Sequence, residues 1–327
     1  MRPAFISSGD LLADRRYALG QASAKAGDLQ AAAELFEQAL ELAPRWSGAS
    51  FALASARREL GDLEGARAGF QKCLEHDGAD AQGASLELAR LGLGEGGAAV
   101  AGAPPAYIAA LFDAYADEFD AALVARLDYR GPELIAAALE PERRRFARTL
   151  DLGCGTGLCG AALRAHSDRL EGVDLSVRMI AKARERGVYD ALECASIEDR
   201  LSRDDGPFDL IAAADVFSYF GDLAPTLRAI ARRLTPPGLL TPGGLCAFTV
   251  EAGDGENWTI AESLRFVHSE AYVRRAVAQS GLAIVSLTAA PLRLDRGAPI
   301  RALIVVAARR VRLIRRRARA RFPASAR

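Results

Sequence analysis

"TLDLGCGTGLCG", residues 149–160, joins an apolar run to a turn that is rich in glycine. The run before the turn has the composition of a buried strand, and a helix can follow it. Gly153, Gly155 and Gly157 permit a backbone turn that a ligand can approach closely. In an open α/β sheet such a turn lies at the carboxyl ends of the strands, where ligands bind. The stretch therefore predicts the first strand, turn and helix of a ligand-binding α/β domain.

Two classes of ligand compete for this turn. Gly155, Gly157 and Gly160 also match the GxGxxG pattern of nicotinamide and flavin sites, with Asp174 placed 19 residues after Gly155 as a ribose-binding acid. Asp151 argues against that class, because a carboxylate at the tip of the strand would repel a pyrophosphate. S-adenosylmethionine carries an ammonium and a sulfonium, which a carboxylate attracts. We therefore expect S-adenosylmethionine as the ligand.

Predicted strands and helices alternate from residue 148 onward. After the first strand, further strands are expected at 170–175, 191–196, 208–215 and 243–251. Helices expected at 176–186 and 222–234 lie between strands, which indicates a parallel α/β sheet. The runs 282–290 and 301–309 follow each other without a helix and predict an antiparallel hairpin. The sheet should therefore be mostly parallel and closed by that hairpin.

The N-terminal third repeats itself with a period of 34 residues, since 26–40 aligns with 60–74. The positions that recur are Gly27 as Gly61, Asp28 as Asp62, Ala32 as Ala66 and Phe36 as Phe70. A period of this length with a turn in the middle indicates an array of helix pairs, and it resembles tetratricopeptide repeats. Residues 83–92 are expected to form a capping helix. The resemblance implies a protein partner for this region.

Further motifs extend a resemblance to class I S-adenosylmethionine-dependent methyltransferases. They are "EGVDLSVRMIAKAR", "FDLIAAADVFSYFGDL" and "LTPGGLCAFTVE". The chain as a whole resembles a bacterial group of methyltransferases with N-terminal tetratricopeptide repeats, which shares "LFDAYADEFD" and "RFVHSEAYV". The resemblance implies a Rossmann-like sheet after an all-α repeat domain, with S-adenosylmethionine as the co-substrate.

The resemblance also implies which residues bind the co-substrate. Asp174 would hold the ribose hydroxyls, Leu175 and Met179 would flank the adenine, and Ser196 would stand where many relatives have a carboxylate. The predicted helix 106–127 would cover the site and bring Tyr115 to it. The full expected set is Asp151, Gly153, Gly155, Gly157, Asp174, Leu175, Met179, Ser196, Ile197 and Tyr115.

Two residues are candidates for a catalytic base. Asp215 follows the fourth strand, although it could instead cap the next turn. His268 precedes Ser269, an expected helix cap, and could equally be a packing residue. Tyr219, Glu251 and Arg265 are weaker candidates for contact with the substrate. Methyl transfer needs no metal, and the three histidines and the lack of a CxxC pair predict none.

Composition sets the expected boundaries and the compartment. The domains are expected at 1–95 for the repeats, 96–105 for a linker, 106–309 for the methyltransferase domain and 310–327 for a basic tail. The nine arginines of 309–327 could bind RNA or an anionic surface, or form a solubilising extension, and they leave residues 1–308 with a net charge of about −9. Five cysteines without a CxxC pair, no secretory segment and no long apolar run favour a cytoplasmic protein.

Two functions stay open from the sequence, apart from the dinucleotide enzyme that Asp151 disfavours. The first is a methyltransferase of unknown acceptor, whose repeats recruit a protein. The alternative is a repeat adaptor whose second domain binds S-adenosylmethionine without catalysis. The intact glycines and acids of the turn favour the first.

Overall fold

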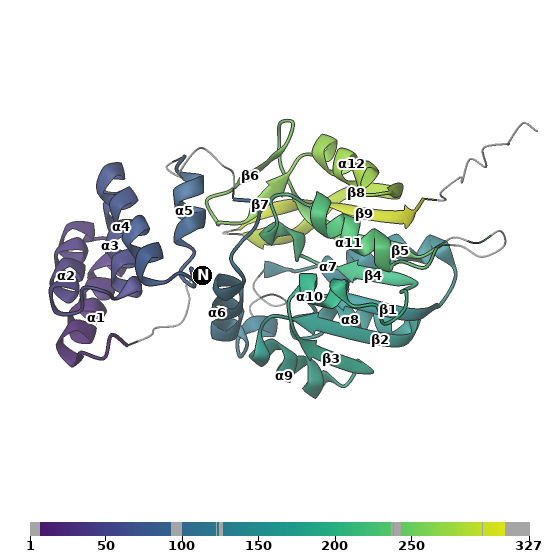
Figure 1. Ribbon diagram of the computed structural model, residues 1–327, viewed down its shortest axis with the longest axis horizontal. Coiled ribbons are helices and arrows are strands. Elements are labelled where there is room, and N and C mark those ends of the chain that lie inside the picture. Colours follow the sequence, from purple (N-terminus) through teal and green to yellow (C-terminus); the bar gives the residue numbers. More distant parts are fainter. Residues whose placement is uncertain are drawn as a thin grey trace, which may run out of the picture.

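The structure is a computed structural model that describes residues 7–92, 100–121, 123, 127–236, 238, 243–295 and 297–310. A bundle of helices forms the N-terminal part, and an α/β domain forms the rest (Figure 1). Helices α5 and α6 lie between the two parts. Most of the expected basic tail, 311–327, and part of the expected linker, 93–99, lie outside the described residues.

The N-terminal helices form the array of helix pairs that the 34-residue period predicts. They are α1 (Leu11–Lys25), α2 (Leu29–Leu42), α3 (Ser47–Glu59), α4 (Leu63–His76) and α5 (Ala84–Arg90). The recurring Gly-Asp pair has a local reason: Asp28 and Asp62 cap α2 and α4, accepting from backbone amides at 3.0 and 2.8 Å. Phe36 and Phe70, one from each repeat, are buried between the helices. The repeat period therefore follows from its caps and its core.

The α/β domain is built on one mixed sheet. Its strands are β1 (Phe146–Leu152), β2 (Ser167–Asp174), β3 (Ala191–Cys194), β4 (Leu210–Ala213), β5 (Leu245–Ala252), β6 (Trp258–Ile260), β7 (Phe266–His268), β8 (Leu282–Asp295) and β9 (Ala298–Arg309). The order is β3-β2-β1-β4-β5-β7-β6, and β9 pairs with β5 and β8. The parallel core and the antiparallel β8–β9 hairpin confirm the predicted sheet. The short strands β6 and β7 were not predicted.

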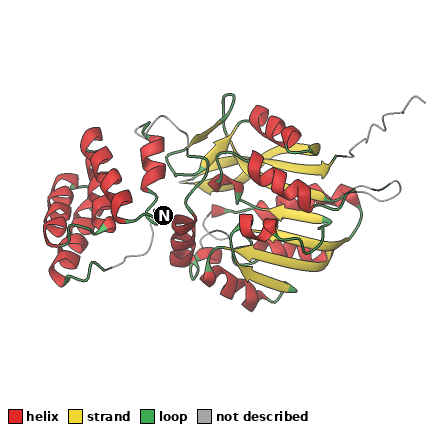
Figure 2. Cartoon of the chain, in the orientation of Figure 1, coloured by secondary structure: helices red, strands yellow, loops and turns green. Residues whose placement is uncertain are grey.

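Helices cover both faces of this sheet (Figure 2). They are α6 (Pro105–Tyr115), α7 (Gly131–Leu139), α8 (Leu158–Leu163), α9 (Val177–Arg186), α10 (Ile197–Ser202), α11 (Ala224–Arg233) and α12 (Glu270–Gln279), with 3₁₀ turns η3 (Glu140–Glu142), η4 (Arg164–His166) and η5 (Phe217–Tyr219). Leu210 and Ala212 of β4 pack with residues of α7 and α8 on one face. Ile211 and Ala213 pack with residues of α11 and α12 on the other. Burial on both faces is why β4 reads as an uninterrupted apolar run.

One expectation about the region before β1 was wrong in part. The single helix expected at 106–127 is broken, because α6 ends at Tyr115 and a turn occupies 116–118. The described part of the expected linker 96–105 forms hydrogen bonds with the α/β domain. Ala101 accepts from the Gly221 amide at 2.8 Å, and Ala103 donates to the Tyr219 carbonyl at 2.8 Å. These bonds fix the entry to α6.

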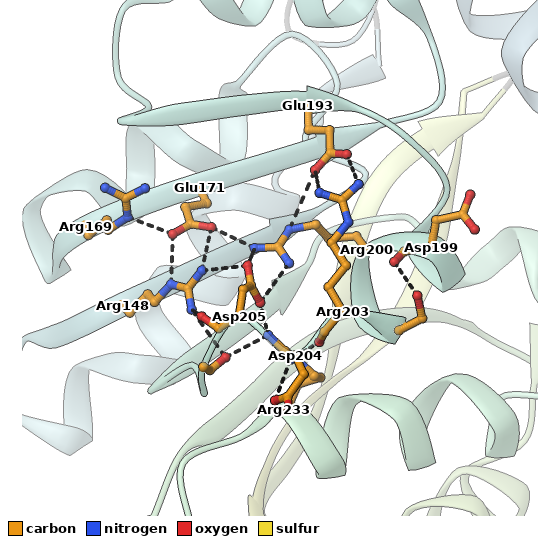
Figure 3. Close-up of polar contacts among 12 residues, drawn as sticks. Arg148, Arg169, Glu171, Glu193, Asp199, Arg200, Arg203, Asp204, Asp205 and Arg233 are labelled. Atoms are coloured by element: carbon orange, nitrogen blue, oxygen red, sulfur yellow. Dashed lines mark hydrogen bonds and ion pairs between the residues drawn. The ribbon is translucent and has the colours of Figure 1, made fainter.

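A buried ion cluster joins β1, β2 and α10 below the sheet edge (Figure 3). Glu171 accepts from Arg148 at 2.8 Å, Arg169 at 2.7 Å and Arg200 at 2.8 Å. The Arg148 guanidinium also lies 4.2 Å from the centre of the Phe208 ring. Burial alone would raise the pKa of Glu171, but the arginine hydrogen bonds outweigh it and lower the pKa to about 2. The carboxylate therefore stabilises the fold while it is charged.

We expect Glu171→Gln to lower the free energy of unfolding by about 2–4 kcal/mol at pH 7, because it removes the acid that the buried Arg200 shares with the partly exposed Arg148 and Arg169. Urea unfolding measures this loss. In the wild type the contribution is present above the unfolded pKa of about 4.3 and is lost as the pH falls toward 2.

Asp168→Asn is the matched control, since the Arg145–Asp168 pair is 57% and 58% exposed. Its effect should stay within about 0.5 kcal/mol. Equal effects of the two variants would contradict a structural role for the Glu171 cluster.

Candidate active site

A cavity of about 480 Å³ opens at the carboxyl ends of β1, β2 and β4. Gly153 and Gly155, which follow β1, line it together with Asp174 at the end of β2. Asp215, after β4, lines it as well. Parallel strands bring these positions to one edge of the sheet, because their carboxyl ends all point the same way. The predicted turn and the predicted acids thus meet in one space.

Each glycine of the turn has its own physical reason. A Cβ on Gly153 would lie 2.6 Å from the Val216 side chain, so this glycine permits close packing. Gly155 has φ +53°, and a Cβ there would meet only Phe119, at 3.8 Å, so its bare backbone faces the cavity. Gly157 has φ +92° and starts α8. Gly155 is therefore the position that a ligand can approach.

Gly160, the last glycine of the alternative GxGxxG pattern, has a packing role. A Cβ at this position would lie 2.2 Å from the Tyr189 ring and hydroxyl. Gly160 is buried inside α8 and does not line the cavity. Gly160 therefore completes the dinucleotide pattern only because Tyr189 packs against it, and the match gives no support to a phosphate site.

Asp151 lies beneath the turn and is not among the residues that line the cavity. It is 1% exposed, and its Oδ2 accepts from the Tyr189 hydroxyl at 2.7 Å. Its Oδ1 has no hydrogen-bond partner among the described residues. Burial raises the pKa of Asp151 to about 7, against the lowering effect of hydrogen bonds from Tyr189 and Cys159. The turn thus covers a carboxyl group that titrates near neutral pH and has an unused acceptor.

Asp174 connects the turn to the next helix. Its Oδ2 accepts from the Gly155 amide at 2.9 Å, and its Oδ1 accepts from the Ser176 amide at 2.8 Å. Burial raises the pKa of Asp174, and these backbone hydrogen bonds oppose that rise. Leu175 and Ile197 line the same space with apolar side chains. The Asp174 carboxylate can therefore accept from a sugar hydroxyl, and Leu175 and Ile197 offer apolar surfaces to a flat ring.

Besides Asp151 and Gly157, three more of the expected contact residues do not line the cavity. Met179 is fully buried in α9, behind the cap that Ser176 provides at 3.0 Å. The Ser196 hydroxyl caps α10 by accepting from the Asp199 amide at 3.0 Å. Tyr115 packs in the apolar cluster of α6 with Tyr107 and Leu111 and does not line the cavity itself.

Helix α6 and the turn after it cover the cavity from above. Phe112 and Phe119 line it, with ring centres 5.8 Å apart. Arg178 of α9 donates to the Asp113 carbonyl at 2.9 Å, and Asp120 accepts from Thr156 and from Arg186. The helix expected at 106–127 was predicted to cover the site, whereas these polar contacts were not predicted. Helical periodicity could have indicated Phe112, whereas pairs so distant in sequence leave no local signal.

The far wall of the cavity is a buried cluster of two acids and two arginines. Arg293 donates to Glu251 at 2.6 Å and to Asp215 at 3.2 Å. Arg265 donates to Asp215 and Glu251, and to the Tyr219 hydroxyl at 2.9 Å. Burial would raise the pKa of Glu251, but the two guanidinium groups outweigh it and lower the pKa. The two positive charges of the arginines therefore balance the two acids of this wall.

Arg293 was missed because an irregularity in β8 turns it inward. The β8–β9 register shifts between Pro291 and Arg293. Leu292 is fully buried and Arg293 is 9% exposed, so two successive side chains point into the protein. A regular strand would have placed one of them outside. The signal in the sequence is an arginine two residues after Pro291 in a mostly apolar strand.

Asp215 holds an uncommon backbone conformation in this wall. Its φ is +59°, in the left-handed region that disfavours a residue with a side chain. The Asp215 amide donates to the Thr249 hydroxyl at 2.8 Å, and its carboxylate accepts from both arginines. Such strain persists where surrounding contacts over-determine it, and it concentrates at functional sites. Asp215 is thus the predicted catalytic candidate that the structure places at the cavity.

His268, the other candidate, lies in the core instead. It is fully buried, and its Nε2 is 3.1 Å from the Gly221 carbonyl oxygen. Its ring stacks on Tyr272 with centres 5.6 Å apart. Burial lowers the pKa of His268 to about 4. Its position fits the packing interpretation, since it does not line the cavity.

The described residues offer no metal site and no membrane span. Within them, no group of three or more His, Cys, Asp or Glu side chains is arranged to hold an ion. None of the described helices has both the length and the apolar character to cross a bilayer. The five cysteines are free thiols.

Comparison with known proteins agrees with this geometry. Residues 150–240 match the family described as a methyltransferase domain, and residues 23–91 match the family described as a tetratricopeptide repeat. A ubiquinone biosynthesis O-methyltransferase of Xylella fastidiosa (strain 9a5c) is 32% identical over 137 residues, which cover 38% of this chain and 56% of that protein. Its counterpart in Xanthomonas oryzae pv. oryzae (strain PXO99A) is 28% identical over 137 residues, 38% of this chain and 57% of that protein. The chain spans about half the length of the curated relatives it matches.

Solved structures with a similar chain path include two methyltransferases. One is the 1,6-didemethyltoxoflavin-N1-methyltransferase of Burkholderia thailandensis, with TM-score 0.47 and 20% identity over 62% of this chain and 88% of that chain. The other is an S-adenosylmethionine-dependent methyltransferase of Clostridium acetobutylicum ATCC 824, with TM-score 0.45 and 18% identity over 61% of this chain and 99% of that chain. The two family matches thus lie on the repeat helices and on the first part of the α/β domain.

Proposed function

We propose that this protein is an S-adenosylmethionine-dependent methyltransferase. The observation that carries the proposal is that the bare backbone of Gly155 and the carboxylate of Asp174 face one cavity at the carboxyl edge of the sheet. The matched methyltransferase domain covers this edge, and the relatives named above are O-methyltransferases. The methyl acceptor of this chain is a separate question.

The residues present suit S-adenosylmethionine by their chemistry. Asp174 still has lone pairs for ribose hydroxyls beyond the two amides it accepts from. Leu175 and Ile197 offer apolar surfaces for adenine. The unpartnered oxygen of Asp151 favours a cationic neighbour over an anionic one. When bound, S-adenosylmethionine supplies an electrophilic methyl group on a sulfonium.

The chain's own contribution is alignment and exclusion of water. Phe112, Phe119 and Tyr219 enclose the cavity opposite the glycine turn. Asp215 presents a fixed carboxylate there, which could orient a hydroxyl or amine of the acceptor by accepting from it. Holding two reactants in line speeds such a reaction, because it removes the entropy of their encounter.

We further infer that the repeats bind a protein partner and that the chain works in the cytoplasm. The match to tetratricopeptide repeats supports the first inference. The free thiols support the second, since reducing compartments keep cysteines unpaired. An alternative function is an adaptor that binds S-adenosylmethionine without turnover. Its support is that both arginines already engage Asp215, the one predicted catalytic residue at the cavity.

Direct binding and label transfer test the proposal. Calorimetry with wild-type protein should give a dissociation constant for S-adenosylmethionine below about 1 mM and no tight binding of NAD. Incubation with methyl-labelled S-adenosylmethionine and fractions of cell extract should move label into a product. No binding at millimolar concentration would sink the proposal, and binding without any transfer would favour the adaptor.

Asp174→Asn should weaken S-adenosylmethionine binding at least tenfold, the loss of about one charge-assisted hydrogen bond. The amide keeps one oxygen acceptor for the turn, so the melting temperature without ligand should stay within about 3 °C. Calorimetry and thermal melting measure the two effects. Asp168→Asn, on the exposed side of the same strand, is the control and should change neither. Unchanged affinity of the Asp174 variant would move the ribose site elsewhere.

Asp151 should couple stability and binding to pH. The folded pKa of Asp151 is about 7 and exceeds the unfolded value of about 3.9. The contribution of this group to the free energy of unfolding is therefore fully present below pH 4 and is lost as the pH rises through 7. Without ligand, Asp151→Asn should remove the part of the decrease in the free energy of unfolding between pH 4 and 7 that comes from this group. Urea unfolding across that range measures it.

A cationic ligand beside Asp151 should favour the carboxylate and release its proton. Affinity for S-adenosylmethionine should then rise about eightfold from pH 6 to pH 7.5 if the group ionises fully on binding. Calorimetry in buffers of different ionisation enthalpy counts the protons released. Asp151→Asn should release fewer, with any remainder coming from groups such as Asp174. Equal proton release by the variant and the wild type would refute this role of Asp151.

A further inference from the structure

Helix α5 is buried on two opposite sides by two different parts of the protein. Leu88 is 6% exposed and packs in a cluster with Ala54 and Phe70 of the repeats. Leu86 is fully buried and packs with Tyr107 of α6 and with Phe266 of β7. Figure 1 shows α5 between the repeat helices and the α/β domain. The last repeat helix therefore belongs to the core of both parts.

The cluster that contains Leu86 shares residues with the lining of the cavity. Tyr219 belongs to the Leu86 cluster and also lines the cavity. On α6, Tyr107 and Leu111 are the buried members of the cluster, while Ile108 and Phe112, one residue further along, line the cavity. Helix α6 is thus the partition between α5 and the ligand space.

This packing leaves little freedom between α5 and α6. Gly83, just before α5, has φ +78°, and a Cβ there would lie 2.9 Å from the Tyr107 ring. Tyr219 continues the path inward, because its hydroxyl accepts from Arg265 at 2.9 Å. Arg265 in turn holds the carboxylate of Asp215. A displacement of α5 is therefore transmitted to the acid in the cavity wall through close contacts.

Helix α5 is also fixed to the repeats by charge. Glu87 is 6% exposed and pairs with Arg58 of α3 and with Arg90 at 2.9 Å. Asp80 accepts from the first two amides of α5, at 2.6 Å for Ala84 and 3.0 Å for Ser85. Because the Arg58–Glu87 pair ties α5 to α3 and the Asp80 bonds fix its first turn to the loop after α4, α5 should follow any rearrangement there.

We propose that α5 is a positioning element of the cavity, and that Leu86 is its contact residue. A partner on the repeats and a ligand in the cavity then alter each other's affinity by the same factor, because binding free energies are linked reciprocally. The repeat domain would act on the site itself and not only as a means of recruitment. The inference rests on the proposed function only in taking S-adenosylhomocysteine as its probe.

Two leucines on α5 provide a matched pair of variants. Leu86→Ala removes the contact with Tyr107 and Tyr219, and Leu88→Ala removes a contact inside the repeats. Both truncate a buried leucine of one helix, so both should lower the stability of the repeats. Only Leu86→Ala should weaken S-adenosylhomocysteine binding, by at least about fivefold in calorimetry, whereas Leu88→Ala should change it less than about twofold. Leu86→Met, which refills the volume, should restore binding.

A measurement without ligand separates this inference from the proposed function. In Leu86→Ala, amide hydrogen exchange should speed up in α6 and in residues 215–222, while Leu88→Ala should leave both segments as in the wild type. Conversely, S-adenosylhomocysteine should slow exchange in α5 of the wild-type protein, although α5 does not line the cavity.

The outcomes are distinguishable. Failure of the wild type to bind the probe would overturn the proposed function, and the exchange rates without ligand would still decide the coupling. Equal effects of the two variants, or no effect of Leu86→Ala on either binding or exchange, would overturn the role of α5. If Leu86→Ala does not fold, the protection of wild-type α5 by the probe supports the inference and its absence overturns it.

Discussion

The pair of hydrogen bonds that Asp174 accepts is the interaction on which the rest of the site depends. It joins the Gly155 amide of one loop to the Ser176 amide of the next, at 2.9 and 2.8 Å. The two loops follow adjacent parallel strands, so a single carboxylate sets the distance between them. Gly155 can then keep φ +53° with its backbone toward the cavity.

Beneath the turn, the ring of Tyr189 leaves no room for a side chain at two glycine positions. Tyr189 lies where a Cβ on Gly160 or Gly172 would be, at 2.2 and 2.9 Å, and its hydroxyl donates to Asp151. Burying an acid this way is costly unless its oxygens are paired, yet Oδ1 of Asp151 has no partner among the described residues. That cost is what raises the pKa of Asp151, and a nearby positive charge would remove it. The polarity of the ligand is thus built into the underside of the turn.

Local patterns predicted what local physics determines. The Gly-Asp pairs of the repeats are turns and caps, and the glycines and acid after β1 and β2 follow from the close approach of a ligand, so both could be read from short stretches. Helical periodicity continues past Tyr115, so the break at 116–118 has no local signal; it accompanies the docking of Asp120 on Thr156 and Arg186. The sequence could not show that His268 is buried, because its burial depends on contacts with Gly221 and Tyr272 in the folded protein. His268 was therefore kept as a candidate base. Arg293 was missed for the same reason, since a register shift turns it inward.

The two buried ion clusters differ in a way that separates support from function. Around Glu171, arginines from β1, β2 and α10 converge on one acid, and Arg148 and Arg200 lie against the Phe208 ring away from the cavity. Around Asp215, two acids and two arginines balance, one tyrosine hydroxyl joins them, and the backbone is held at φ +59°. A left-handed aspartate gains nothing for the fold by itself, because a regular conformation would be cheaper. This strained residue lines the cavity, while Tyr219 connects the same cluster to the packing of α5 and α6.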